Sequence, residues 1–526
     1  MSRSEHIGTN GLPLAPGLGD VPAAPAKALG SRERLVELIR ERFAGRRLVV
    51  VSNRAPVLHV RGEGGRLATL QPASGLTTAM LPIVEACGGT WVAHGGGTAD
   101  FDVTDARGGL GWPPERPAFR LRRVRLAPDV ERGYYYGLAN EALWPLCHVA
   151  YVPPVFRHRD WAHYREANRA FADAVLDELG DGPGVVFVND YHFALLPRML
   201  RRARPDLLVA HFWHIPWPNR QVWGLLPWAE EFLDGLLGSD LLGFHVQGHC
   251  GHFLDTVDRA LEARVEHEYH RATRGGHATF VRPFPISIDA RAFTALARAR
   301  PFEAAFPGVA ARTDGRLVLL GVDRLDYTKG IPHRLQMFET LLERHPDFRG
   351  RATLVQVGAP TRSVLPRYAA LAREVAALVA GINTRFGTPG WRPVLYLDEH
   401  HDRDALAALY RRADACLVTS LHDGMNLVAK EYVAARAGLP GTLLLSKFTG
   451  AARELLEASL INPYDVEGSA EVLAAALRLP DAARAEGMRR MLSRLERHDV
   501  YNWARRLFRS LDEVAWRREA LGFPGT

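Results

Sequence analysis

Short apolar runs alternate with segments of helical spacing along most of the chain. In the first half, the runs at residues 47–57, 184–192 and 207–218 each end in polar or proline-bracketed positions. Apolar positions three to four residues apart occupy residues 167–179. Buried parallel strands form near-continuous apolar runs, and their alternation with helices is typical of doubly wound α/β domains. The pattern predicts such a domain over residues 31–290.

A second series of the same kind begins at residue 316. It predicts strands at 316–324, 352–358, 394–398 and 415–418, with helices at 331–345, 368–382 and 404–413. We therefore expect a second α/β domain over residues 291–490. The last segment, 491–526, contains an amphipathic stretch that we expect to cross back over the first domain. Binding residues of α/β sheets lie at the carboxyl ends of the strands, so the two domains should face each other across a cleft.

The termini and the composition bound the class of protein. Residues 1–30 are rich in Gly, Pro and Ala without periodicity and are predicted to be disordered, and Ser31 is a candidate cap for a helix over 33–43. With 47% apolar and 24% charged residues, the 526-residue chain has a soluble composition. No apolar run approaches the roughly 18 residues of a membrane span, and no export signal precedes the first helix. We expect a cytoplasmic protein with four reduced cysteines.

The net charge of +7 is spread along the chain, which favours an anionic ligand and not a nucleic acid. Only four of the 66 basic residues are lysines. In so arginine-rich a chain, a lysine is mildly informative, because it marks a place where a compact ammonium fits the site better than a planar guanidinium.

The stretch 415–437 predicts a strand, a turn at Asp423-Gly424 and a helix capped by Asn426. Free N–H groups at a helix N-terminus make an anion site, and the Asp423 carboxylate just outside is free to accept sugar hydroxyls. Glu431, over one turn further in, could reach the ribose of a nucleotide. The alternative is an ordinary capped helix of an α/β domain.

Two cations lie in the loop after the apolar strand that begins at residue 316. Arg324 and Lys329 would suit a diphosphate and could neutralise charge on a leaving phosphate. The alternative is a surface loop with solvated charges.

Candidate residues of the first half also follow strands. Asp190, His192 and His214 would line one sheet edge, although buried structural histidines are common. Arg54, with Arg362 from the second half, could clamp one phosphate from both domains. Aromatic walls for a sugar could come from Tyr135 and Trp144, whose alternative is core packing.

Metal sites are not expected. Asp100-Phe101-Asp102 imitates a metal–nucleotide motif but lacks a preceding strand. The cluster at residues 245–252, with three histidines and Cys250, does not have a common zinc spacing. His400-His401 is interpreted as a polar loop that closes a strand.

Several blocks, in order, resemble the trehalose-6-phosphate synthase family. They are SNRAPV, YYxGLANxxLWPL, NDYH, HIPWP, VDRLDYTKG, APTR, INTRFG and LVTSLHDGMNLVAKEY, and the resemblance covers about residues 46–515. It implies a GT-B fold of two Rossmann-like domains and a metal-independent, cofactor-free enzyme. The implied reaction moves glucose from UDP-glucose, or GDP-glucose in some members, to glucose 6-phosphate with retention.

The resemblance also implies site roles. Arg324, Lys329, His214 and Asp190 would be catalytic, His214 lying near the reacting carbon. The implied acceptor-binding residues are Arg54, Tyr135, Trp144, Asp190 and Arg362. The implied donor-binding residues are Gly75, His401 on the base side, Asp423, Gly424, Met425, Asn426, Leu427, Val428, Ala429, Lys430 and, for the ribose, Glu431. Ser74 replaces a usual Gly, and His94 a usual Trp.

The mechanism favoured at this point is same-face attack, because no unassigned carboxylate is available as a nucleophile for double displacement. Two alternatives stay open. One is a related synthase with another phosphorylated acceptor, such as glycerol 3-phosphate or a cyclitol phosphate. The other is a non-catalytic sugar-phosphate sensor on the same fold. The nucleobase and the oligomeric state are not indicated by the sequence, although a homo-oligomer is compatible with it.

Overall fold

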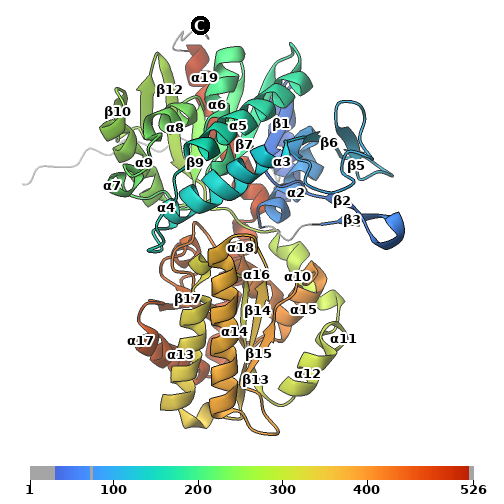
Figure 1. Cartoon of the computed structure of the whole chain (residues 1–526), viewed down its shortest axis with the longest axis vertical. Helices are drawn as coiled ribbons and strands as arrows, with labels where there is room; N and C mark the ends of the chain where they lie inside the picture. The colour runs from blue at the N-terminus through green and yellow to red at the C-terminus, as the bar shows by residue number, and fades with distance from the viewer. Residues whose placement is uncertain (1–29, 72–74, 521–526) are drawn as a thin grey trace, which may run out of the picture.

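Strands from the first half of the chain form a ten-stranded sheet, and strands from the second half form a six-stranded sheet in a second lobe (Figure 1). The computed structural model describes residues 30–71 and 75–520. The predicted disordered tail lies, except for Gly30, outside the described residues, as does Ser74.

The first sheet has the order β10-β11-β12-β9-β8-β7-β1-β4-β6-β5. Its centre is parallel, and only β5 and β11 run antiparallel to their neighbours. Val50 of the central strand pairs with Trp91 on one side and Phe187 on the other. The bounds are β1 Arg47–Ser52, β4 Thr90–His94, β5 Gly109–Trp112, β6 Phe119–Val124, β7 Gly184–Asn189, β8 Leu208–Phe212, β9 Leu241–Phe244, β10 Arg264–Glu266, β11 Arg271–Arg274 and β12 His277–Pro283; β2 Leu58–Arg61 and β3 Leu67–Leu70 form a separate hairpin.

Helices cover both faces of this sheet because its central strands are buried on both sides; every residue of β7, for example, is buried. The segment that carries YYYGLANEAL is π-helical, a form that is rare and often marks functional sites. The bounds are α1 Ser31–Arg42, α2 Gly75–Cys87, α3 Pro128–Glu131, the π-helix η2 Arg132–Leu143, α4 Trp144–His148, α5 His158–Leu179, α6 Leu196–Ala203, α7 Arg220–Trp223, α8 Ala229–Leu236 and α9 Gln247–Ala260.

The second sheet is wholly parallel, with the order β15-β14-β13-β16-β17-β18. This is the dinucleotide-binding order 3-2-1-4-5-6, whose topological switch point lies between β13 and β16. Ligands bind outside the carboxyl ends of the strands at that point. The bounds are β13 Leu317–Arg324, β14 Ala352–Ala359, β15 Val394–Leu397, β16 Ala415–Val418, β17 Thr442–Ser446 and β18 Ser459–Ile461.

The chain crosses between the lobes twice. After the second sheet it returns through α19, which packs on α1, α2, β8 and β9. Two hydrogen bonds hold the crossing segments together. Val500 N donates to Ile288 O at 3.1 Å, and Trp503 Nε1 donates to Phe284 O at 3.1 Å. The domain boundaries at residues 290 and 490 stay a prediction. The bounds are α10 Ala290–Ala299, α11 Phe302–Ala305, α12 Pro307–Thr313, α13 Ile331–Arg344, α14 Pro366–Phe386, α15 Arg403–Arg412, α16 Leu427–Ala435, α17 Val466–Leu477, α18 Asp481–Arg497 and α19 Val500–Ala520.

Two local predictions were wrong. The cap of α1 is Gly30, and Ser31 is its first residue, because the Ser31 hydroxyl donates instead to the Asp499 carboxylate at the start of α19. The first strand ends at Ser52 and not at residue 57, where the chain turns toward the other lobe.

The discounted metal motifs have structural roles. Asp100 is fully buried, accepts from the backbone N–H groups of His59 and Gly97, and pairs with Arg123. Within residues 30–71 and 75–520, no group of three or more His, Cys, Asp and Glu side chains is arranged to hold a metal ion. The four cysteines are free, as expected.

Candidate active site

The switch point of the second sheet brings two predicted loops together. Asp326 caps the turn η4 (Tyr327–Lys329) by accepting from Thr328 N at 3.1 Å and Thr328 Oγ1 at 2.9 Å. Gly330 then takes a φ of 62°, and a side chain there would strike the carbonyl oxygen of Thr419. This tight turn against the β16 loop directs Lys329 toward Asp423.

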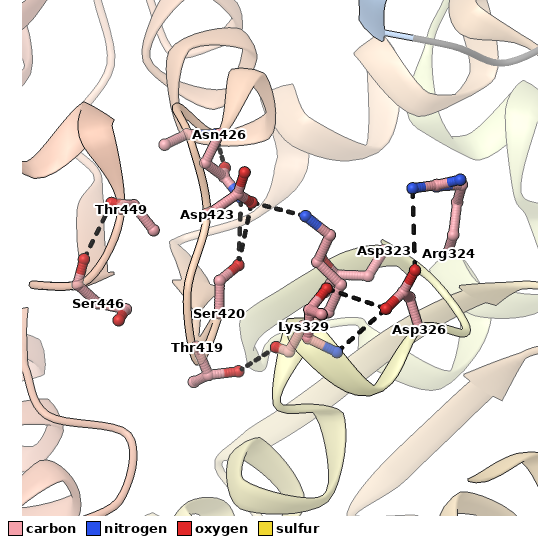
Figure 2. Close-up of polar contacts among 12 residues, drawn as sticks. Asp323, Arg324, Asp326, Lys329, Thr419, Ser420, Asp423, Asn426, Ser446 and Thr449 are labelled. Atoms are coloured by element: carbon pink, nitrogen blue, oxygen red, sulfur yellow. Dashed lines mark hydrogen bonds and ion pairs between the residues drawn. The ribbon is translucent and has the colours of Figure 1, made fainter. Parts of the chain in front are cut away.

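Lys329 and Asp423 form an ion pair across the switch point (Figure 2). Lys329 Nζ lies 2.6 Å from Asp423 Oδ2, which also accepts from Asn426 Nδ2 at 3.2 Å and Ser420 Oγ at 3.4 Å. Burial favours the neutral acid, but the ammonium outweighs it and lowers the pKa of Asp423 to about 2. The lysine and two polar neighbours thus occupy Oδ2 of Asp423, and the role of this carboxylate toward a sugar stays a prediction.

Asn426 caps α16 as predicted, its Oδ1 accepting from Ala429 N at 3.0 Å. Its φ of 92° is one that asparagine tolerates better than most residues. The first N–H groups of the helix point out of its end beside Lys329. Gly75, at the start of α2 in the first lobe, meets this end, since a Cβ there would lie 3.3 Å from Leu427 Cδ1.

Further along α16, the side chains of Glu431 and Lys430 point in different directions. Tyr410 OH donates to Glu431 Oε2 at 3.4 Å, and burial raises the pKa of Glu431 to about 7 against the opposing charge of Arg403. Lys430 is fully buried and turns away, donating to Ile286 O at 2.6 Å and pairing with Glu454 at 2.5 Å. Its side chain fastens α16 to the segment between the lobes.

His401 lies after β15, at the same sheet edge but on the outer strand. Its ring packs edge-on against Phe306 at 5.0 Å, and its buried Nε2 lacks a hydrogen-bond partner among the described residues. An unpaired buried nitrogen is costly unless something satisfies it. The geometry leaves this atom available to a ligand at the outer end of the site.

On the first lobe, Arg54 follows β1 and Tyr135 lies on the π-helix η2. Arg54 Nη2 donates to Tyr135 OH at 3.2 Å, and the Tyr135 ring stacks on His192 at 5.8 Å. Burial opposes ionisation of this phenol, but Arg54, Arg362 and Arg324 together lower its pKa to about 7. Cations from both lobes thus converge on one hydroxyl.

Asp326 connects the same lobes, a role that the sequence interpretation missed. This fully buried carboxylate accepts from Trp144 Nε1 of the first lobe at 3.2 Å and from Arg362 Nη1 of the second at 3.2 Å. Arg324 Nη2 approaches it to 4.0 Å (Figure 2). The guanidiniums of Arg362 and Arg324 lie 4.5 and 5.8 Å from the Trp144 ring centre. The only sequence signal was the place of Asp326 between two candidate cations.

Asp190 and His214 lie together at the carboxyl ends of β7 and β8. Asp190, at φ 77°, accepts from Tyr191 N at 3.0 Å and His214 N at 3.3 Å. Burial raises its pKa to about 7, although these bonds and two arginines oppose the shift. His214 Nε2 lies 3.0 Å from Asn189 Oδ1, and burial lowers its pKa well below the ordinary value. Gly424 abuts the His214 carbonyl, where a Cβ would lie at 2.5 Å.

The structure therefore collects most predicted site residues at the junction of the two sheet edges. His401 and Glu431 lie at the outer side of this junction, and the Lys430 side chain points away from it. His94 ends β4 beside Glu131, their nearest atoms 4.0 Å apart, and burial lowers the pKa of His94 against the opposing charge of Glu131.

Known proteins are similar to this chain over most of its length. The family model of glycosyltransferase family 20 matches residues 46–513. The chain belongs to this family. It is 39% identical over 485 residues to trehalose-6-phosphate synthase of Mycobacterium marinum, covering 90% of this chain and 96% of the relative. The predicted family and enzyme class, a glycosyltransferase, are thus confirmed.

Two solved structures are similar to the chain as a whole. An E. coli trehalose-6-phosphate protein bound with UDP-2-fluoro glucose gives a TM-score of 0.80 at 31% identity, covering 89% of this chain and 99% of that one. The alpha,alpha-trehalose-phosphate synthase (UDP-forming) from Burkholderia xenovorans, in complex with glucose-6-phosphate, gives 0.79 at 32% identity, covering 88% and 99%. The predicted GT-B fold is confirmed. No helix within the described residues of this glycosyltransferase is long and apolar enough to cross a membrane.

Proposed function

We propose that this glycosyltransferase moves glucose from UDP-glucose to glucose 6-phosphate with retention and without a metal ion, giving α,α-trehalose 6-phosphate. The observation that carries the proposal is that arginines of both lobes gather at one place: Arg54 donates to Tyr135 OH at 3.2 Å, and Arg362 and Arg324 of the second lobe lie 4.5 and 5.8 Å from the ring centre of Trp144 in the first lobe. Cations from two sheets are brought together in this way where an anionic substrate has to be bound between them. The names of the relatives, and the sugar phosphate and nucleotide-sugar analogue bound to two of them, point to the same substrates.

The acceptor phosphate takes the place between Arg54 and Arg362, next to the Tyr135 hydroxyl. Arg362 is well prepared for this role, because Asp326 and the Tyr368 hydroxyl, at 3.2 and 2.8 Å, fix its guanidinium. Trp144 forms the wall beneath it. Asp190, at the neighbouring strand end, is placed to bind a sugar hydroxyl.

The donor diphosphate lies against Arg324, Lys329 and the N-terminus of α16. Gly75 lies next to this site, because it approaches Leu427, the first residue of α16, closely. The glucose hydroxyls then compete with Lys329, Asn426 and Ser420 to donate to the Asp423 carboxylate, and Glu431 accepts from the ribose. His214 is neutral, since burial disfavours its imidazolium, and its Nε2 bond to Asn189 fixes the ring. It acts as a hydrogen-bonding group beside the donor sugar and not as a charge.

Transfer proceeds by same-face attack. The acceptor hydroxyl oxygen bonds to the anomeric carbon on the side from which the diphosphate departs, and its proton passes to the leaving phosphate oxygen. The carboxylates of Asp423 and Asp326 are each paired with cations, which leaves neither free to act as a covalent nucleophile. Arg324, Lys329 and the helix N-terminus stabilise the charge that develops on the leaving group, the task that a metal ion performs elsewhere.

An acceptor screen tests the proposal. The protein is incubated with UDP-glucose or GDP-glucose and with glucose 6-phosphate, glycerol 3-phosphate or a cyclitol phosphate, in the presence of EDTA. Nucleotide release and the NMR spectrum of the product are measured. We expect UDP release with glucose 6-phosphate and a product with two α-linked anomeric centres. Faster turnover with another acceptor would indicate a related synthase, binding without turnover would indicate a sensor, and loss of activity in EDTA would contradict the metal-free mechanism.

A further inference from the structure

A second arginine-rich site lies in the first lobe, as a cavity of about 580 Å³. It is formed by α6, the turn between β11 and β12, and the end of α19, at the end of the first lobe that points away from the second lobe (Figure 1). Seven arginines and only two carboxylates, Asp234 and Asp240, line it. Its volume is in the range of small-molecule sites.

The cavity is distinct from the active site. Its lining residues Pro205 and Asp240 precede β8 and β9, and therefore lie at the amino ends of these strands. Asp190 and His214 lie at the carboxyl ends of β7 and β8, on the opposite edge of the sheet. A ligand in the cavity would not touch the reacting groups.

Part of the arginine cluster is structural. Arg201 and Arg518 share Asp240, at 2.5 and 3.4 Å, and each also donates to the carbonyl oxygens of Pro205 and Leu207. Arg198 and Arg274 share Asp234 at 3.2 and 3.0 Å. These bonds hold α6, α19 and the β11–β12 turn together and use both carboxylates.

The remaining charge has no such structural purpose. Arg202, with 77% of its side chain exposed, is 3.9 Å from the already shared Asp234. Arg517 is exposed, and its guanidinium lies over the face of Phe280, 5.8 Å from the ring centre. The wall has seven guanidiniums and two carboxylates, and Arg271 is paired with Glu266 next to the cavity, which leaves a formal excess of four positive charges. A cluster of guanidinium groups favours phosphate as a ligand, because each planar guanidinium can donate two parallel hydrogen bonds to it.

We propose that this cavity binds a small anion with two or more phosphate groups. A single phosphate carries about 1.5 to 2 negative charges, so one group would leave half or more of the excess unbalanced. A bound polyphosphate would join Arg202 of α6 to Arg517 of α19. Since α19 is the segment that returns from the second lobe, the ligand would fasten this helix to the first lobe.

The test is calorimetric titration with inorganic tripolyphosphate. The active site also binds phosphates, so all proteins carry Arg324→Ala and Lys329→Ala to remove that contribution. We expect this background to bind tripolyphosphate in a 1:1 ratio, with an affinity that falls as salt is added. Adding Arg202→Gln and Arg517→Gln should weaken binding about tenfold or more, because two charge-assisted contacts are lost.

The matched control is the pair Arg169→Gln and Arg373→Gln, which removes the same charge from exposed arginines elsewhere. It should leave the affinity unchanged. Equal weakening by both pairs would show a general charge effect and overturn the proposal. Loss of binding in the background itself would assign the tripolyphosphate to the active site, with the same consequence. Orthophosphate binding as tightly as tripolyphosphate would contradict the requirement for more than one phosphate group.

Discussion

Arginine-rich sites lie at both edges of the first lobe's sheet, one of them shared with the second lobe, and they are built differently. At the lobe junction, Arg362 is 4% exposed and is fixed by the fully buried Asp326 and by aromatic neighbours. In the remote cavity, the buried arginines are fixed by Asp240, while Arg202 and Arg517 reach solvent. The junction therefore holds its cations in one geometry before a ligand arrives, and the cavity leaves part of its charge mobile.

This difference bears on what each site can do. A charge that is fixed and withdrawn from water stabilises a transition state without reorganisation, whereas an exposed flexible charge contributes mainly to binding. We therefore expect substitutions at the junction to change turnover and substitutions in the cavity to leave it unchanged.

The largest effect is expected for Lys329→Ala. Loss of the ammonium beside the leaving diphosphate should lower turnover by about two to three orders of magnitude, as for removal of a single group that stabilises transition-state charge. Steady-state nucleotide release and far-UV circular dichroism would measure rate and fold. Lys447→Ala, at an exposed position, is the matched control and should behave as the parent. Near-parental turnover of Lys329→Ala would remove Lys329 from the mechanism.

Asp326→Asn and Asp240→Asn provide a matched pair, because both residues are buried carboxylates shared by arginines. Each should lower the melting temperature, since each leaves a buried guanidinium without its counter-charge. Only Asp326→Asn should also raise the KM for glucose 6-phosphate, by about tenfold, because Arg362 loses the partner that orients it. Similar KM values in the two variants would mean that Asp326 only supports the fold.

A smaller effect is expected from Tyr135. Its pKa is lowered to about 7 by the surrounding arginines, so above that pH its phenolate competes with the acceptor phosphate for the same cations. The affinity for glucose 6-phosphate should therefore fall by a few-fold as the pH rises through about 7. Tyr135→Phe should flatten this dependence, and Tyr136→Phe should retain it. Titrations at several pH values would measure the Kd; a Tyr135→Phe profile like that of the parent contradicts the competition.

Much of the fold and of the junction could be predicted because the signals are local. The strand at 415–418, the cap at Asn426 and the cations after β13 each follow from a few adjacent residues. The side-chain directions could not be predicted in this way. Lys430 and Glu431 are neighbours in the sequence, but tertiary packing turns Lys430 to Ile286.

The remote cavity and the role of Asp326 are non-local. Arg202, Arg274 and Arg517 come from distant parts of an arginine-rich chain, so nothing in their spacing marks them as a group. Asp326 is likewise recognised only when the fold brings it together with Trp144 at the start of α4 and Arg362 in the loop after β14. The Ser31 cap was mispredicted for a similar reason, because its competing partner Asp499 lies at the far end of the chain.

The central claim is that cations from both lobes bind one acceptor phosphate. A double-mutant cycle of Arg54→Gln and Arg362→Gln, with calorimetric Kd values for glucose 6-phosphate, tests it most directly. If both side chains bind one phosphate, the double variant should lose less affinity than the sum of the single losses, with a coupling of about 1.4 kcal/mol, or tenfold. Strictly additive losses would contradict the claim, because they would place the two arginines on separate groups.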